Sequence, residues 1–241
     1  FDSIDKTKLV ILIDDFHKCK LKEQYRNMFS RLINENFENV IYTSNNSIIF
    51  NEFRIGKAIA DLAMFNGTSK VFEIKTILDK EYRLSNQIQE YKKIFNEVYI
   101  IVPKQQVLKY LNYDNSVGVV TYDSILKKFE LYRKAEKINK LDSEILMEIL
   151  HSKEYVKISK NYYGELPEMN SFNQFEICKK LISKIPQNDL NNLFIATMKD
   201  RNINNQFFNK VNNEFNQISL SLNLKRQERD KLINILKTNT I

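Results

Sequence analysis

The chain has 241 residues and a net charge of +7, with 37 Lys and Arg against 30 Asp and Glu. Its hydrophobic residues, 43% of the total, can build a core, but there is no run of about 18 apolar residues, so we expect no transmembrane helix and no membrane partner. The basic balance, with an isoelectric point near 9.1, favours a polyanionic partner such as nucleic acid.

Hydrophobic periodicity predicts a strand-rich first part of the chain. In chain order we expect an apolar run at 8–14 (a strand or a helix start), a helix at 18–36, strands at 48–55, 58–65 and 70–76, a helix at 79–96, a strand at 97–102, a short helix at 104–111, a strand at 117–121 and an edge strand at 128–133. Gly56-Lys57 and Asn66-Gly67 predict the turns of a three-stranded antiparallel meander. This order of elements predicts an α/β fold with a mixed sheet.

The strand signals fade after about residue 138. Helical patterns are predicted at 141–151, 172–185, 188–200 and 219–237. We therefore predict a first domain at residues 1–138, followed by a helical appendage or second domain at residues 139–241.

Cysteine and histidine are too few and too scattered to predict a zinc site. Cys19 and Cys178 lie far apart, and His17 and His151 are the only histidines. We expect free thiols in a reducing cytoplasm rather than a disulfide framework. The start at Phe1 shows no signal peptide, so the expected site of action is the cytoplasm, with delivery into another cell as the alternative for a toxin fragment.

Two acids and a lysine are predicted to meet where the second and third strands pair. Alternation along a strand puts Glu73 and Lys75 on one face and Ile74 on the other. The intervening hairpin brings Asp61 of the preceding strand opposite the Glu73 region. An exposed sheet face with an ordinary Glu–Lys pair would contain the same residues, and on these residues alone both interpretations stay open.

Two carboxylates and one ammonium group suit the hydrolysis of a phosphodiester bond. Mg²⁺, or Mn²⁺, takes oxygen ligands, which Asp61, Glu73 and the carbonyl group of Ile74 can supply. Such a cation lowers the pKa of its bound water and polarises the phosphate. Lys75 can hold the attacking water and offset the developing negative charge.

The spacing of these residues resembles a known nuclease superfamily. Asp61, eleven intervening residues and then Glu73-Ile74-Lys75 resemble the core motif of the PD-(D/E)xK nucleases. Ala60 stands where that superfamily has Pro before the first Asp. Over about residues 48 to 102 the chain also resembles a bacterial family of small restriction-endonuclease-like proteins found near mobile elements.

The helix that follows adds a second part to the resemblance. Gln87 and Tyr91 are four residues apart, so they share one helix face, and they resemble the Q-x-x-x-Y motif of the RecB-like branch. Packing of Tyr91 in the core is the alternative, and it is compatible with a role in the site. The resemblance implies a restriction-endonuclease-like fold: a mixed central sheet flanked by helices, with an α-βββ-α-β core and a C-terminal helical region.

The resemblance implies a Mg²⁺-dependent endonuclease that hydrolyses DNA, in bacterial defence or in conflict between bacteria or mobile elements. Gln87 and Tyr91 would join Asp61, Glu73 and Lys75 as catalytic residues. One alternative is an RNA- or tRNA-cleaving toxin with the same site, and a toxin would need an immunity protein as partner. The other alternative is a non-catalytic module that binds nucleic acid or protein.

Four further residues are weaker candidates. Glu52 on the first strand is a metal ligand or a water-orienting carboxylate in one interpretation and a surface partner of Arg54 in the other. Arg54 shares its face by alternation and could contact a phosphate, as could Arg83. Asp79 is predicted to cap the following helix at its N-terminus.

Overall fold

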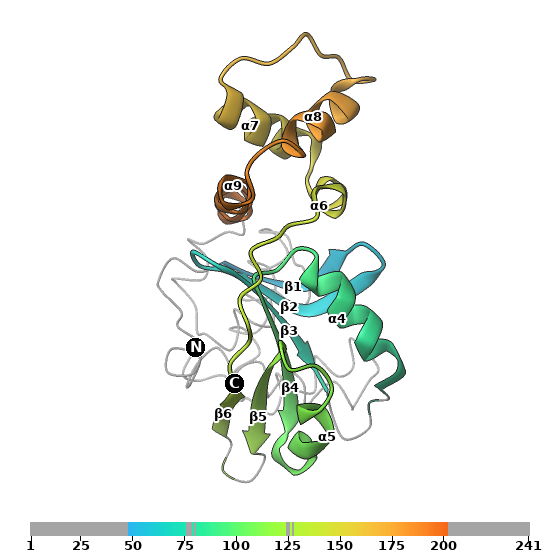
Figure 1. Ribbon diagram of the computed structural model, residues 1–241, viewed down its shortest axis with the longest axis vertical. Helices are drawn as coiled ribbons and strands as arrows, with labels where there is room; N and C mark the ends of the chain where they lie inside the picture. Colours follow the sequence, from blue (N-terminus) through green and yellow to red (C-terminus); the bar gives the residue numbers. More distant parts are fainter. Residues whose placement is uncertain (1–47, 76–78, 80, 124–125, 127, 202–241) are drawn as a thin grey trace, which may run out of the picture. The chain divides into compact units, whose positions relative to one another are not determined.

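The computed structural model describes residues 48–75, 79, 81–123, 126 and 128–201, all within one compact unit, Thr43–Arg201. The strands are β1 (Ile48–Ile55), β2 (Ala58–Phe65), β3 (Ser69–Ile74), β4 (Glu97–Pro103), β5 (Gly118–Asp123) and β6 (Lys128–Arg133) (Figure 1). The helices are α4 (Leu84–Lys92), α5 (Val107–Leu111), α6 (Ser143–Ile149), α7 (Ser152–Tyr163), α8 (Gln174–Ile182) and α9 (Gln187–Asp200), with short 3₁₀-helices η2 (Glu81–Arg83) and η3 (Lys104–Gln106). The elements predicted at 8–14, 18–36 and 219–237, together with His17 and Cys19, lie outside the described residues.

The strands form one sheet in the order β1-β2-β3-β4-β5-β6. β1, β2 and β3 pair as an antiparallel meander, β3, β4 and β5 pair in parallel, and β6 returns antiparallel to β5. The β2–β3 hairpin closes with Phe65 opposite Ser69, and Gly67 in its loop has a φ of 98°, which favours glycine. The predicted mixed α/β architecture, a mixed sheet flanked by helices, is confirmed.

The parallel centre of the sheet is buried. Every residue of β3 is buried, and along β4 only Pro103 is not fully so. This burial agrees with the continuous apolar run predicted at 97–102, because a strand between two parallel neighbours is covered on both faces. Pro103 ends the strand because it has no N–H to donate.

Helix α4 begins later than the sequence predicts. The 3₁₀-helix η2 comes first, and the N-cap of α4 is Arg83, whose side chain makes no cap hydrogen bond. The prediction that Asp79 caps this helix is therefore wrong for α4. Its apolar face, which includes Leu84 and Ile88, is buried and packs on β2 and β4.

The helix α7 is the element that the sequence analysis missed. Only Tyr155, Ile158 and Ser159 among its twelve residues are buried, so the apolar stripe is too thin to stand out. Its start is marked instead by a hydrogen bond of 2.7 Å from the backbone N–H of His151 to Glu154 Oε2. No helix within the described ranges is long and apolar enough to cross a membrane.

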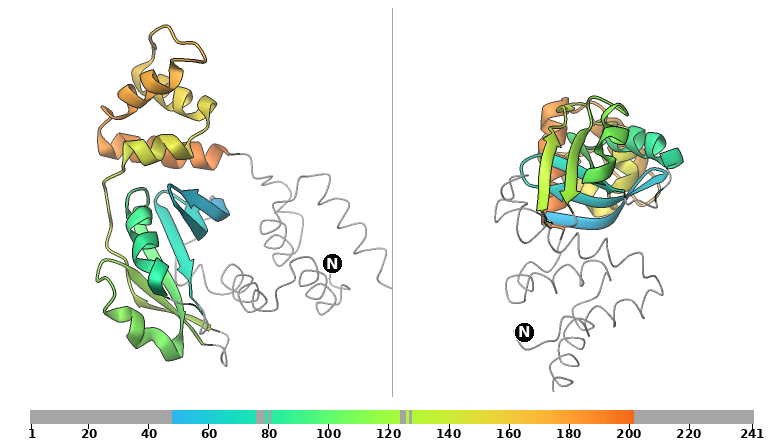
Figure 2. Two further views of the ribbon diagram at one scale, coloured as in Figure 1. Left: turned by 90° about the vertical axis from the view of Figure 1, so that its right-hand side faces the viewer. Right: turned by 90° about the horizontal axis from the view of Figure 1, so that it is seen from below.

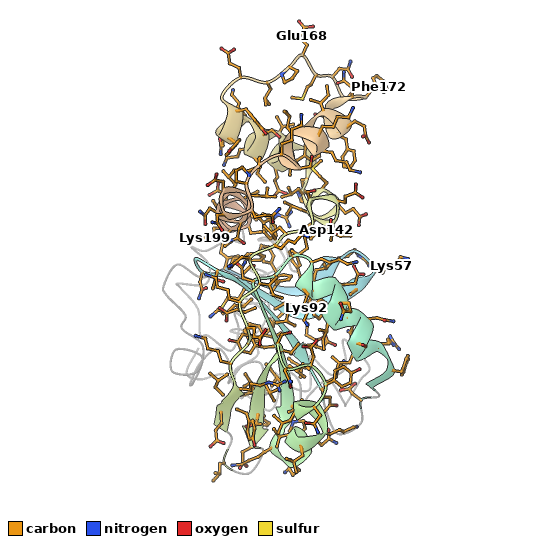
Figure 3. The ribbon with its side chains drawn as sticks, in the orientation of Figure 1. Lys57, Lys92, Asp142, Glu168, Phe172 and Lys199 are labelled. Carbon is orange, nitrogen blue, oxygen red and sulfur yellow. The ribbon has the colours of Figure 1, made fainter. Side chains whose placement is uncertain are left out.

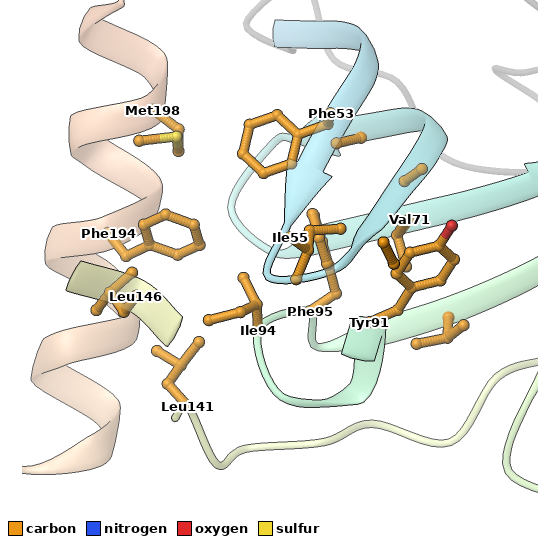
Figure 4. Packing of buried hydrophobic residues seen from close by; sticks show 14 of the residues in the cluster. Phe53, Ile55, Val71, Tyr91, Ile94, Phe95, Leu141, Leu146, Phe194 and Met198 are labelled. Atoms are coloured by element: carbon orange, nitrogen blue, oxygen red, sulfur yellow. The ribbon is translucent and has the colours of Figure 1, made fainter. Parts of the chain in front are cut away.

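Helix α6 packs on β1 and α9 on β2, and α7 and α8 pack on these two helices rather than on the sheet (Figure 2). Phe194 of α9 meets Phe65 of β2 edge to face, with ring centroids 5.5 Å apart. Phe53, Leu146 and Met198 belong to the same core (Figure 4). Sheet and helices thus share one core inside Thr43–Arg201, and a domain boundary at residue 138 stays a prediction.

We expect Phe194→Ala to lower the free energy of unfolding by about 3–5 kcal/mol, because it opens a cavity in this shared core. Phe172→Ala is the matched control, since Phe172 is 96% exposed before α8 (Figure 3) and should change stability by less than about 0.5 kcal/mol. Urea unfolding followed by far-UV circular dichroism measures both, because the chain has no Trp. Equal effects of the two substitutions would contradict the shared core.

Candidate functional site

The strands β2 and β3 separate at the position of the predicted acids. Their ladder runs from Phe65 opposite Ser69 to Leu62 opposite Phe72, and the next positions in this register are Asp61 and Glu73. No backbone pair forms there. Instead, the backbone N–H of Ile74 donates to Asp61 Oδ2 at 2.7 Å, so the side chain of β2 replaces its backbone as the partner of β3.

A change in the alternation of β2 accounts for this separation. Ala60 and Ala63, three residues apart, both belong to the hydrophobic core. Side chains of a regular strand alternate, so the strand must change phase between these two residues, which is where Asp61 lies. The distortion places a carboxylate where a regular strand would continue the ladder.

The carboxylate of Glu73 is buried, with 4% of the residue exposed, and receives three donors. Lys75 Nζ and Gln87 Nε2 each lie 2.7 Å from Glu73 Oε1, and the hydroxyl of Tyr91 donates to Glu73 Oε2 at 2.6 Å. Lys75 Nζ also donates to Gln87 Oε1 at 3.3 Å. Because both Glu73 and Lys75 are buried, the interpretation as an exposed sheet-face pair is wrong.

Helix α4 brings Gln87 and Tyr91 to the sheet on one face. Tyr91 is completely buried in the core (Figure 4), and burial, followed by the charge of Glu73, raises the pKa of its hydroxyl. The hydroxyl oxygen also lies 2.9 Å from the carbonyl oxygen of Ile59. Tyr91 therefore packs in the core and also joins Glu73 of β3 to β2, two residues before Asp61.

Asp61 is partly buried and electrostatically disfavoured as an anion. Burial is the largest cause and the negative charge of Glu73 the next, and together they raise the pKa of Asp61 to about 7. The hydrogen bond from Ile74 and the charge of Lys75 lower the pKa, whereas the charge of Asp79 raises it further. From the sequence, Asp79 was only a weaker candidate for which a capping role was favoured, so this electrostatic influence was not predicted.

The oxygen atoms that the site presents are of the type that binds a hard divalent cation. Asp61 Oδ1 has no hydrogen-bond donor among the described residues, and Glu73 Oε2 accepts from Tyr91 alone. The N–H of Ile74 points toward β2, and the carbonyl of the same strand residue points to that side too. The candidate ligands are two carboxylates and a carbonyl oxygen, which are oxygen atoms of the kind that Mg²⁺ prefers over the nitrogen and sulfur ligands of Zn²⁺. Within the described residues, no group of three or more His, Cys, Asp or Glu side chains could hold a metal ion.

The remaining candidates are not brought into this cluster. Glu52 is exposed, its φ of 51° is left-handed, and it is not among the charges that shift the pKa of Asp61. Arg54 is exposed on β1, and no ion pair joins it to Glu52 in the described residues. Arg83 is exposed at the start of α4. A metal role for Glu52 and phosphate contacts by Arg54 and Arg83 stay predictions.

A family model described as bacteriophage P4 protein cII matches residues 20–225. The chain belongs to this family. Protein cII of Enterobacteria phage P4 is 29% identical over 180 residues, which cover 71% of this chain and 66% of the phage protein, so this cII-family chain spans about two thirds of its relative. Among solved structures, a protein of unknown function from Silicibacter pomeroyi aligns with a TM-score of 0.34 and 15% identity, over 52% of this chain and 85% of that one.

We expect the cII-family chain without metal to lose stability as the pH rises from about 4 to 7. The pKa of Asp61, about 7 when folded, exceeds its ordinary value of 3.8, so in this window the folded state holds a proton that the unfolded chain has released. Asp61→Asn removes this dependence and keeps an acceptor for Ile74. At pH 8 in EDTA it should be more stable than the natural chain by on the order of 1–4 kcal/mol.

Urea unfolding at pH 5 and pH 8 measures the effect, and the difference should shrink at pH 5. The exposed Asp189 in the first turn of α9 provides the control, because Asp189→Asn should act equally at both pH values. A destabilised Asp61→Asn at pH 8 would show that the carboxylate is not held at a raised pKa.

Proposed function

We propose that this cII-family chain is a metal-dependent nuclease that hydrolyses DNA phosphodiester bonds on a restriction-endonuclease-like core. The observation that carries the proposal is the convergence on Glu73 of Lys75, Gln87 and Tyr91, with Asp61 at the facing position of β2. A Glu73–Lys75 ion pair with a merely structural role would not need a second acid, Asp61, at the facing position. Two acids and a lysine around a point of strand separation supply the groups that phosphodiester hydrolysis requires.

The proposed cation is Mg²⁺ or Mn²⁺, held by Asp61, Glu73 and the carbonyl oxygen of Ile74. When bound, it supplies a water of lowered pKa and neutralises charge on the phosphate. The electrostatics of the protein support this proposal, because the charge of Glu73 raises the pKa of Asp61 and a bound positive ion would offset that cost.

The chain's own residues then orient the reactants. Lys75, an ammonium donor at 2.7 Å from Glu73, holds a water for attack and offsets negative charge that develops on the phosphate. Gln87 donates to Glu73 through its amide nitrogen and accepts from Lys75 through its amide oxygen, and so it fixes the carboxylate and the ammonium group relative to each other. Tyr91 sets the separation between β2 and β3 through Ile59 and Glu73.

The order of the elements supports this proposal. The β1–β2–β3 meander followed by α4 and a parallel β4 matches the βββ-α-β part of the proposed core. A relative from a phage is consistent with a role in conflict between mobile elements and their hosts. DNA is the proposed substrate, and RNA is the alternative that the test below separates.

Replacing the charges of the site should abolish cleavage. Glu73→Gln and Lys75→Met keep the size of each side chain and should each slow plasmid nicking by about 10²-fold or more in Mg²⁺. Glu165→Gln and Lys153→Met, at exposed positions of the same chain, are the matched controls and should cut normally. The assay uses supercoiled plasmid and total RNA, with Mg²⁺, Mn²⁺ or EDTA.

Each result of this assay is informative. Cleavage of RNA but not of DNA would show that the chain is an RNA-cleaving enzyme with the same site. Cleavage at the natural rate by Glu73→Gln would place the active site elsewhere. No cleavage of either substrate with any divalent ion would mean that the chain is a binding module rather than an enzyme.

Metal binding can be tested without any substrate. Mg²⁺ or Mn²⁺ should raise the Tm of the natural chain, since a ligand at about 100 times its Kd stabilises the folded state by about 2.7 kcal/mol. Asp61→Asn and Glu73→Gln should lose most of this shift, whereas Asp189→Asn should keep it. An equal shift in all four proteins would show that the ions bind elsewhere.

A further inference from the structure

An aromatic side chain is exposed immediately before α4, the helix that carries Gln87 and Tyr91, and it is held in place by a cation. Tyr82 in η2 is 68% exposed. Arg83 Nε donates to the Tyr82 hydroxyl at 2.8 Å, and the guanidinium carbon lies 5.1 Å from the ring centroid. The cation–π contact and the hydrogen bond fix the ring while most of its surface stays open to solvent.

The position of this pair immediately before α4 relates it to the acids. Arg83, Gln87 and Tyr91 recur every four residues and therefore form one stripe along the helix. The inner members of the stripe bind Glu73, and the outer member is the exposed Arg83, about 6 Å further along the helix axis from Gln87. One end of this stripe, at Gln87 and Tyr91, binds the buried carboxylate of Glu73. The other end, at Arg83, is exposed to solvent and adjoins Tyr82.

We propose that Tyr82 stacks on an unpaired base of the substrate while Arg83 contacts the adjoining phosphate. This inference rests on the proposed function and deepens it, because it assigns the substrate class as nucleic acid that is single-stranded next to the cleaved bond. The bases of a duplex are stacked on one another and offer no free face, whereas an unpaired base can lie flat on an aromatic ring.

The chemistry of the pair fits both parts of a nucleotide. The ring supplies a flat apolar surface whose orientation is already set, so little side-chain entropy is lost when a base stacks on it. The guanidinium is a planar donor that suits phosphate oxygens. Tyr132, which is 53% exposed on the edge strand β6, has no comparable link to the acids and serves as the control position.

Fluorescence of 2-aminopurine tests the stacking directly. The full chain is titrated in EDTA, which prevents the proposed hydrolysis, with a labelled single-stranded DNA, the same sequence as RNA, and the DNA as a duplex. For the natural chain we expect quenching of the probe in a single strand. Tyr82→Ala should weaken single-strand binding by about tenfold and remove the quenching, because one base–aromatic stack is lost.

The controls separate stacking from folding and from general charge. Tyr82→Trp should keep both binding and quenching, and Tyr132→Ala should behave as the natural chain. The inference is wrong if Tyr82→Ala binds as tightly as Tyr132→Ala, or if it weakens duplex binding as much as single-strand binding. It is equally wrong if the natural chain does not quench the probe.

The test is independent of catalysis. Because no bond is broken in EDTA, stacking on Tyr82 would be seen even if Glu73→Gln showed the nuclease proposal to be wrong. Conversely, loss of cleavage in Glu73→Gln combined with unaltered binding by Tyr82→Ala would leave the nuclease in place and overturn only the assignment of the substrate.

Discussion

The burial of the Glu73 carboxylate is the constraint on which the candidate site depends. A buried charge without partners costs several kcal/mol, so its oxygens must receive donors. Lys75 is supplied by the same strand, and Gln87 and Tyr91 are supplied by α4. Since two of the three donors come from the helix, the face of α4 that carries Gln87 and Tyr91 has to turn toward the sheet, where α4 packs on β2 and β4. Satisfying a single carboxylate thus sets the position of a helix on the sheet.

The same arrangement makes the ionised form of the second acid, Asp61, unfavourable. Asp61, by contrast, accepts a hydrogen bond from the backbone N–H of Ile74, and no side chain of the described residues donates to it. Its pKa is therefore raised by burial and by the charge of Glu73. This contrast between a stabilised and a disfavoured carboxylate is the basis of our proposal of a positively charged ligand and of metal-dependent hydrolysis.

Local patterns predicted the strands well and the helices less well. Period-two alternation and the turn residues placed β1, β2 and β6 at their observed bounds, because these signals lie within a few residues of chain. The helix α7 was missed, because only three of its residues are buried. Asp79 was predicted to cap the helix at 79–96, but η2 precedes α4, whose N-cap is Arg83, and the charge of Asp79 contributes to the raised pKa of Asp61.

The sequence by itself determined which residues could meet: alternation put Glu73 and Lys75 on one face, the hairpin set Asp61 opposite, and the four-residue spacing aligned Gln87 with Tyr91. Only the tertiary structure decided how they meet. The phase change in β2, the bond between Tyr91 and the Ile59 carbonyl and the burial of the ion pair depend on packing between distant segments. The local periodicity of the sequence does not predict such contacts, because each depends on how the whole core is packed.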